Sequence, residues 1–242
     1  METVSNIHGS GEGRCCRPPT AGISSDSFRT SSHGLLIERA VYRKPSADSL
    51  RAVFALLLVV LAQTPEWRHD RTVDGLKLDL RAVQNSKYDE LRITTTVPGD
   101  LQRLCDAIFA KGVGEKVEGS FKKRTILKET DTERWAYEQI ALPIVSDRDY
   151  VVHVKLEQPA STGRCEVSFQ TEDDPDRPPA PGHVRLTCVR GSWTVIPTAD
   201  GKLSITYLVF SDPGGDIPPF LVHGGQRNAA LEFLRTILTR AK

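Results

Sequence analysis

The chain has 242 residues, with 32 lysines and arginines against 31 aspartates and glutamates, so its formal net charge is +1. Charges of both signs are scattered along the sequence without a basic stripe, which argues against a nucleic-acid partner. The five cysteines are an odd number without a C-x-x-C pair. We therefore expect Cys105, Cys165 and Cys188 to be small core residues, with neither a disulfide framework nor a zinc site.

The first sixty or so residues predict an extension followed by an export signal. Residues 1–50 are rich in Ser, Gly, Arg and Pro and are expected to be disordered, or to precede a true start near Val41 or Leu50. Residues 51–63 (RAVFALLLVVLAQ) contain an apolar run about half as long as a segment that spans a bilayer. Small residues in the pattern of a signal-peptidase cleavage site follow it. We expect a signal peptide at 51–62 and a periplasmic or secreted protein. Without that signal the protein would be cytoplasmic. The alternative interpretation of the apolar run is a buried helix of the domain.

Residues 64–242 are the predicted folded domain, which begins with a polar helix or turn around residues 66–70. Apolar and polar residues then alternate in GLKLDLRAV and ELRITTTV, which predicts two paired strands. Pro98, Gly99 and Asp100 precede a predicted helix over 101–110. Longer antiparallel strands are expected at 120–129, 133–142, 149–157, 165–172, 183–197 and 202–210. The last two should form a hairpin, with a bulge at Gly191.

The last thirty residues predict a long terminal helix. Pro218 and Pro219 suit a first helical turn, and the apolar residues that follow recur at roughly helical spacing. The first half of this helix fills little space, because it carries Gly224, Gly225, Ala229 and Ala230. Either another backbone or a non-protein molecule lies against it, and tight packing on a sheet is the simpler alternative. The elements together favour an α+β fold, a curved antiparallel sheet wrapped around the helix.

Three segments together resemble the StAR-related lipid-transfer (START) domain of the helix-grip superfamily, in its bacterial form. They are LPIVSDRDYV (142–151), VRGSWTVIP (189–197) and SDPGGDIPPFLV (211–222), in the order and spacing of that family. The resemblance implies a helix-grip fold with an apolar internal cavity under the C-terminal helix. It also implies one lipid or sterol-like ligand, transient membrane contact, no cofactor and a monomeric protein.

The resemblance and the strand alternation together predict the ligand contacts, although each of these residues could also be ordinary core. They are Ile93, Tyr150, Val152, Val154, Val167, Phe169, Leu186, Ile205, Tyr207, Phe220, Leu221, Gly224 and Leu231. Arg148 and Asp149 match the R-D pair of the family and are expected to make structural ion pairs or hydrogen bonds. Some lipid-binding relatives have an arginine at the position of Val154, so we expect a more apolar cavity here.

Metal and catalytic chemistry are not indicated. The acidic and basic residues lie along the polar faces of the predicted strands, and we expect these faces to be solvated. No two of the six histidines stand at metal-ligand spacing, and no nucleophile or phosphate-binding motif occurs, so no metal-binding or catalytic residue is predicted. We expect a lipid carrier, or a sensor that uses the same cavity. The alternative is a helix-grip cyclase or hydrolase for a polyketide-like or aromatic substrate, with Tyr150, Tyr207 and His223 as candidate acids or bases.

Overall fold

The computed structural model describes residues 65–109, 121–142, 145–157, 163–186, 188–215 and 217–242. The predicted extension and signal segment, residues 1–63, lie outside these ranges. Among the described residues, no helix is both long enough and apolar enough to cross a membrane.

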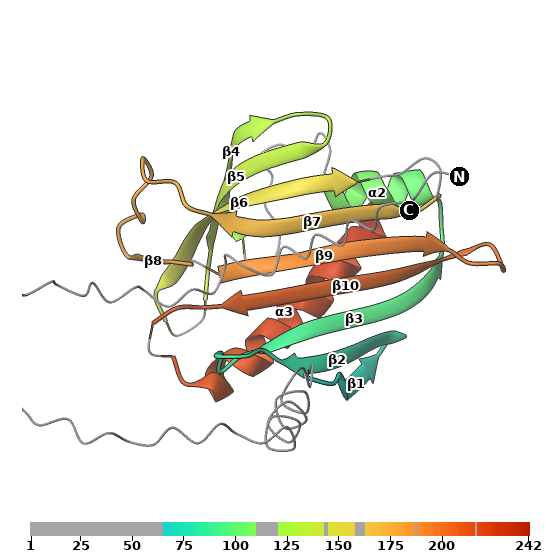
Figure 1. The fold of residues 1–242 in the computed structure, drawn as a ribbon, viewed down its shortest axis with the longest axis horizontal. Helices are drawn as coiled ribbons and strands as arrows, with labels where there is room; N and C mark the ends of the chain where they lie inside the picture. Colours follow the sequence, from blue (N-terminus) through green and yellow to red (C-terminus); the bar gives the residue numbers. More distant parts are fainter. Residues whose placement is uncertain (1–64, 110–120, 143–144, 158–162, 187, 216) are drawn as a thin grey trace, which may run out of the picture. The chain divides into compact units, whose positions relative to one another are not determined.

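The described strands form one ten-stranded sheet (Figure 1). Its order is β1-β2-β3-β10-β9-β7-β6-β5-β4, with all these neighbours antiparallel, and β8 pairs in parallel with β6. The strands are β1 Arg68–Val73, β2 Leu76–Ala82, β3 Asp89–Pro98, β4 Phe121–Glu129, β5 Glu133–Ile140, β6 Asp147–Glu157, β7 Cys165–Glu172, β8 His183–Arg185, β9 Cys188–Pro197 and β10 Lys202–Asp212. Because β10 pairs with β3, the last hairpin completes the sheet between its two halves.

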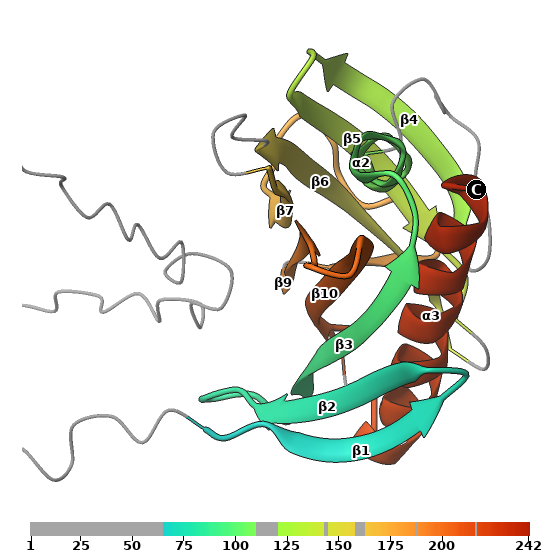
Figure 2. The same cartoon turned by 90° about the vertical axis from the view of Figure 1, so that its right-hand side faces the viewer.

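Two helices of the described chain, α2 (Leu101–Phe109) and α3 (Pro219–Arg240), accompany this sheet. Asp100 caps α2, since its Oδ1 accepts a hydrogen bond of 2.8 Å from the Arg103 amide. Pro218 and Pro219 start α3 as predicted. In Figure 2, α3 runs along the open side of the curved sheet, from the β1–β2 hairpin towards β4. This arrangement confirms the predicted α+β helix-grip fold.

Contacts to both edges of the sheet hold α3 in place. Arg227 Nη1 lies 3.3 Å from Asp70 Oδ1 of β1. At the opposite edge, the ring of Phe233 lies 6.3 Å from that of Phe121 in β4, centroid to centroid. The helix also buries the side chains of Val222, Ala230, Leu231, Leu234 and Ile237, so α3 contributes to both apolar clusters of the core.

Three local predictions are wrong. The strand expected at 183–197 is divided, because residues 183–185 form β8, which pairs in parallel with β6, and β9 begins at Cys188. Residues 68–70, expected in a polar helix or turn, belong to β1, which pairs with β2 at the edge of the sheet. Five of the six residues of β1 are polar. The strand therefore lacks the alternation of apolar and polar residues that would have predicted it, and its pairing stabilises it. Gly191 is not in a bulge, because it pairs in register with Phe169 and Val209. The Phe169 ring occupies the space that a side chain at Gly191 would need.

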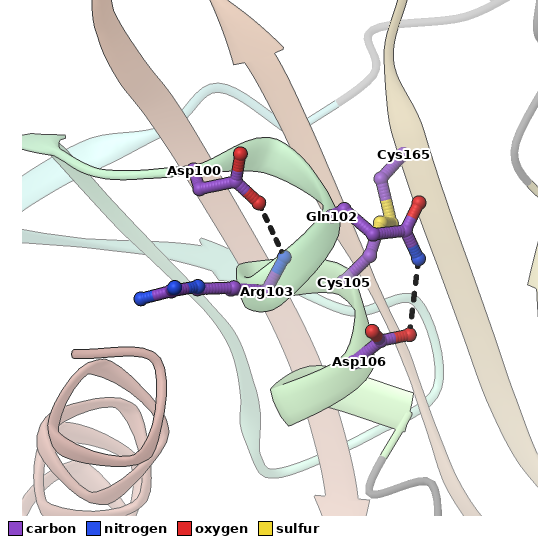
Figure 3. Close-up of a disulfide and its surroundings, with 6 residues drawn as sticks. All are labelled: Asp100, Gln102, Arg103, Cys105, Asp106 and Cys165. Carbon is purple, nitrogen blue, oxygen red and sulfur yellow. Dashed lines mark hydrogen bonds between the residues drawn. A yellow bond between two sulfur atoms is a disulfide. The ribbon is translucent and has the colours of Figure 1, made fainter.

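Cys105 and Cys165 form a disulfide, so the prediction that they are unlinked core residues is wrong (Figure 3). Their Cα atoms are 6.1 Å apart, within the usual range for a disulfide. Cys105 lies on the buried face of α2 and Cys165 opens β7, so the bond fastens the helix to the sheet. The two residues are 60 positions apart, and only the fold brings them together. Cys188 is buried in a separate cluster.

Candidate ligand-binding site

A pocket of about 800 Å³ lies between the sheet and α3. Its walls come from strands β3 to β7, β9 and β10, from one side of α3, and from Ile108 of α2. Aliphatic and aromatic side chains supply most of the strand walls, and the volume falls within the roughly 300–1,000 Å³ of small-molecule sites. The pocket can therefore accept a ligand with a large apolar surface.

Seven of the thirteen predicted contact residues line this pocket. They are Tyr150, Val152, Val154, Val167, Phe169, Leu186 and Tyr207. The even-numbered residues of β6 face inwards because successive side chains of a strand point to opposite faces of the sheet. Alternation along the strands was therefore sufficient to find the inward face at the centre of the sheet.

Three other predicted contacts belong to the solid core. Ile93, Ile205 and Leu231 are 0%, 0% and 4% exposed and do not line the pocket. They share the inward orientation of the pocket residues, but neighbouring side chains cover them completely. Strand alternation distinguishes inside from outside, and it does not distinguish a packed interior from a cavity.

The start of α3 differs from the prediction in detail. Phe220 is 76% exposed, and Gly224 is exposed and does not line the pocket. The side chain of Leu221 lies outside the described structure. Gly225 does line the pocket, and a Cβ atom placed there would meet no atom within 4 Å. The space that the small residues leave is thus beside Gly225 and Ala229, one helical turn apart.

Three charged residues that the sequence interpretation placed on solvated faces line the pocket: Arg124 of β4, and Arg134 and Glu138 of β5. Arg124 Nε donates a hydrogen bond of 2.7 Å to Glu138 Oε1, and the Tyr150 hydroxyl donates one of 2.6 Å to Glu138 Oε2. Arg134 stands opposite Val154 in the register of β5 and β6. The pocket is therefore not lined by apolar side chains alone, because the strand next to Val154 contributes an arginine to its wall. That the cavity is more apolar than those of relatives stays a prediction.

The candidate acids and bases of the enzyme hypothesis do not form a reactive group. Burial raises the pKa of the Tyr150 hydroxyl, as does the negative charge of Glu138, and burial also raises the pKa of Tyr207. Both tyrosines therefore keep their protons at neutral pH. His223 does not line the pocket, and its ring packs edge-on against Tyr88. In the described ranges, no three His, Cys, Asp or Glu residues are grouped to hold a metal ion.

Arg148, at the start of β6, holds the segment that leads into α3. Its side chain is buried, with Nε donating a hydrogen bond of 2.8 Å to the Pro213 carbonyl and Nη2 one of 3.2 Å to the Gly214 carbonyl. Hydrogen bonds from a charged donor are among the stronger ones in proteins. Arg148 thus fixes the loop at one end of the pocket without lining the pocket itself.

Asp149 holds the proline-rich loop next to it. Its Oδ2 accepts hydrogen bonds of 2.7 Å from the Tyr137 hydroxyl and from the Ala180 amide, and its Oδ1 accepts one of 2.9 Å from Arg185 Nε. Burial raises the pKa of this carboxyl group, but the hydrogen bonds from Arg185, Ala180 and Tyr137 outweigh burial and lower it. Asp149 is therefore ionised and fully engaged at neutral pH.

Comparison with known proteins gives one close sequence relative. The chain is 30% identical over 199 residues to the uncharacterized protein PA1579 of Pseudomonas aeruginosa, a match that covers 79% of this chain and 93% of that protein. The two proteins therefore belong to one sequence family. No protein-family model matches the sequence.

Solved structures identify the wider family. The chain resembles a STAR-related lipid transfer protein fragment from Xanthomonas axonopodis, with 26% identity, a TM-score of 0.59, and coverage of 71% of this chain and 96% of that one. Human StAR-related lipid transfer protein 5 shares the fold at 20% identity and a TM-score of 0.60, over 81% of this chain and 95% of that one. With the helix-grip fold and this bacterial relative, the chain is a START-like domain protein, similar to the StAR-related lipid-transfer (START) domains.

Proposed function

We propose that this protein binds one hydrophobic molecule, a lipid or sterol-like compound, in the pocket beside α3, and that it carries or senses this ligand as a monomer. The observation that supports the proposal is the pocket itself, about 800 Å³ with largely aliphatic and aromatic strand walls. Burying roughly 500 Å² of ligand surface at about 25 cal/mol per Å² contributes on the order of 12 kcal/mol before the costs of association. Binding of that strength needs no covalent chemistry.

Replacing Gly225 by Phe should abolish ligand binding and leave the fold intact. A Cβ atom at this position meets open space, and the added ring would extend into the pocket that Gly225 lines. Native mass spectrometry of the protein purified from a lipid-containing host would detect the ligand in the wild type and its absence in G225F.

The neighbouring glycine provides the matched control. A Cβ atom at Gly224 also meets no atom within 4 Å, but Gly224 does not line the pocket, so G224F should bind like the wild type. Both variants gain the same helix propensity, and only one fills the site. A well-folded G225F protein that retained its ligand would show that the ligand lies elsewhere.

A carrier must also contact a membrane, and the start of α3 is the surface we propose for this contact. Phe220 is 76% exposed there, while Ile217 and Val222 on either side of it line the pocket. An exposed aromatic side chain suits the interface between lipid and water. Its position beside the pocket would place the site close to the bilayer.

Replacing Phe220 by Ser should slow lipid transfer between vesicles several-fold without changing the equilibrium affinity for the same lipid. The reason is that the change removes a membrane contact and leaves the pocket walls unaltered. Transfer of a fluorescent lipid from donor to acceptor vesicles measures the rate. Ile196→Ser is the control, because Ile196 is 46% exposed and does not line the pocket. Equal transfer rates for F220S and the wild type would argue for a sensor, or for a different contact.

We also propose that the protein is exported and works in an oxidising compartment such as the periplasm. The disulfide between Cys105 and Cys165 supports this location, because disulfides persist in oxidising compartments and are rare in the cytosol. The signal expected at residues 51–62 is a second, independent indication. Alkylation of free thiols in the protein as isolated from cells tests the proposal, since a reduced pair would contradict it.

A further inference from the structure

In the described parts of the chain, the hydroxyl group of Tyr207 has no hydrogen-bond partner. The residue is 5% exposed and lines the pocket from the middle of β10. Its ring stacks on Trp193 with 3.9 Å between centroids and lies 6.1 Å from the ring of Phe233 in α3. Burial raises the pKa of this hydroxyl. Because the hydroxyl is unpaired but not fully enclosed, it opens on the pocket that Tyr207 lines.

The other tyrosine of the pocket shows the contrast. The Tyr150 hydroxyl donates to Glu138, and Arg124 neutralises the same carboxylate, so these three groups satisfy one another. A buried hydroxyl without a partner is unfavourable, and nearly all such groups in proteins have one. The open space next to the Tyr207 hydroxyl is therefore where a hydrogen-bonding group from outside the chain would lie.

The surroundings of Tyr207 select against charge in that group. Two charged residues of the pocket, Arg124 and Glu138, already pair with each other and with the Tyr150 hydroxyl. The adjacent groups are the aromatic rings of Trp193, Phe233 and Phe169. An ion placed among them would lose its hydration without gaining a counter-ion. A neutral oxygen would lose little hydration free energy there and would gain a hydrogen bond.

We propose that Tyr207 determines ligand specificity by hydrogen bonding to an uncharged oxygen, a hydroxyl or carbonyl, on an otherwise apolar ligand. This inference rests on the proposed function and names the class of ligand: a hydrophobic molecule with a neutral oxygen that reaches the middle of β10. Trp193 and Phe233 hold the tyrosine ring, so the hydroxyl is presented in one orientation. The hydrogen bond would set the position of the ligand along the pocket.

The test compares three probes of equal chain length: tetradecane, myristyl alcohol and myristate. Each is supplied from cyclodextrin, and its affinity is measured by displacement of anilinonaphthalene sulfonate from the wild type and from Tyr207→Phe. The wild type should prefer the alcohol to the alkane by about three- to tenfold, the usual worth of a neutral hydrogen bond. Y207F should lose this preference and keep the affinity for the alkane.

Tyr137→Phe is the matched control, because it removes a buried tyrosine hydroxyl that does not line the pocket. It should keep the preference for the alcohol. Two results would overturn the inference: equal binding of alcohol and alkane by the wild type, or a preference for the alcohol that survives in Y207F. In either case, binding of the alkane would still support the proposed function. Tighter binding of myristate than of the alcohol, unchanged in Y207F, would overturn it as well. Failure of all three probes to bind would overturn both.

Discussion

Replacing Cys105 and Cys165 together by Ala should lower the free energy of unfolding by about 4 kcal/mol. The disulfide joins residues 60 positions apart, so it removes much of the chain entropy that the unfolded state would otherwise gain. It also fixes α2, whose Ile108 lines the pocket, against β7. Urea unfolding of the wild type, with and without dithiothreitol, and of the double variant measures the effect. The reduced wild type and the double variant should unfold at the same midpoint.

Cys188→Ala controls for the loss of a buried sulfur, since Cys188 lies in a separate cluster. Its unfolding midpoint should still fall when dithiothreitol is added, whereas the midpoint of the double variant should not respond. A wild type that is equally stable with and without the reductant would mean that the two thiols are unlinked in solution. That result would also remove the support that the disulfide gives to an exported protein.

The sequence was sufficient for the fold because its signals are local. Alternation in β6 and β7 gave the inward face, and Pro218 and Pro219 gave the start of α3. The features that the sequence did not predict depend on contacts between segments that are far apart in the chain. The pairing of Cys105 with Cys165 follows from the placement of α2 on β7, and no spacing in the chain encodes it.

The same limit explains the errors at the site. Val154 and Ile93 both alternate inwards, and only the position of α3 and its core side chains decides that one faces the pocket and the other is packed. Arg124 and Glu138 were interpreted as residues of solvated faces, because charged side chains usually lie on faces that contact solvent. A buried arginine next to a buried carboxylate on the neighbouring strand is favourable only as a pair, and strand pairing is invisible in either strand alone.

Replacing Asp149 by Asn should lower the free energy of unfolding by about 3 kcal/mol, because it leaves the Arg185 guanidinium partly buried without its carboxylate. Asp147→Asn on the same strand is the control. Its carboxylate pairs with Lys122, whose side chain is 53% exposed, so the change should have little effect. Urea unfolding at pH 7 compares the three proteins. An unfolding midpoint of D149N equal to that of the wild type would show that the network at Asp149 does not stabilise the fold.

The pH dependence of the stability provides a second test of the role of Asp149. The pKa of Asp149 is lower in the folded protein than its ordinary value, so the ionised carboxylate contributes stability above the unfolded pKa of about 3.9. That contribution is lost as the pH falls from there through the folded pKa. The difference in stability between the wild type and D149N should therefore be constant from pH 7 to about 5 and shrink below about pH 4. Since Asp149 holds the Ala180 amide, hydrogen exchange at that amide should also be faster in D149N than in D147N.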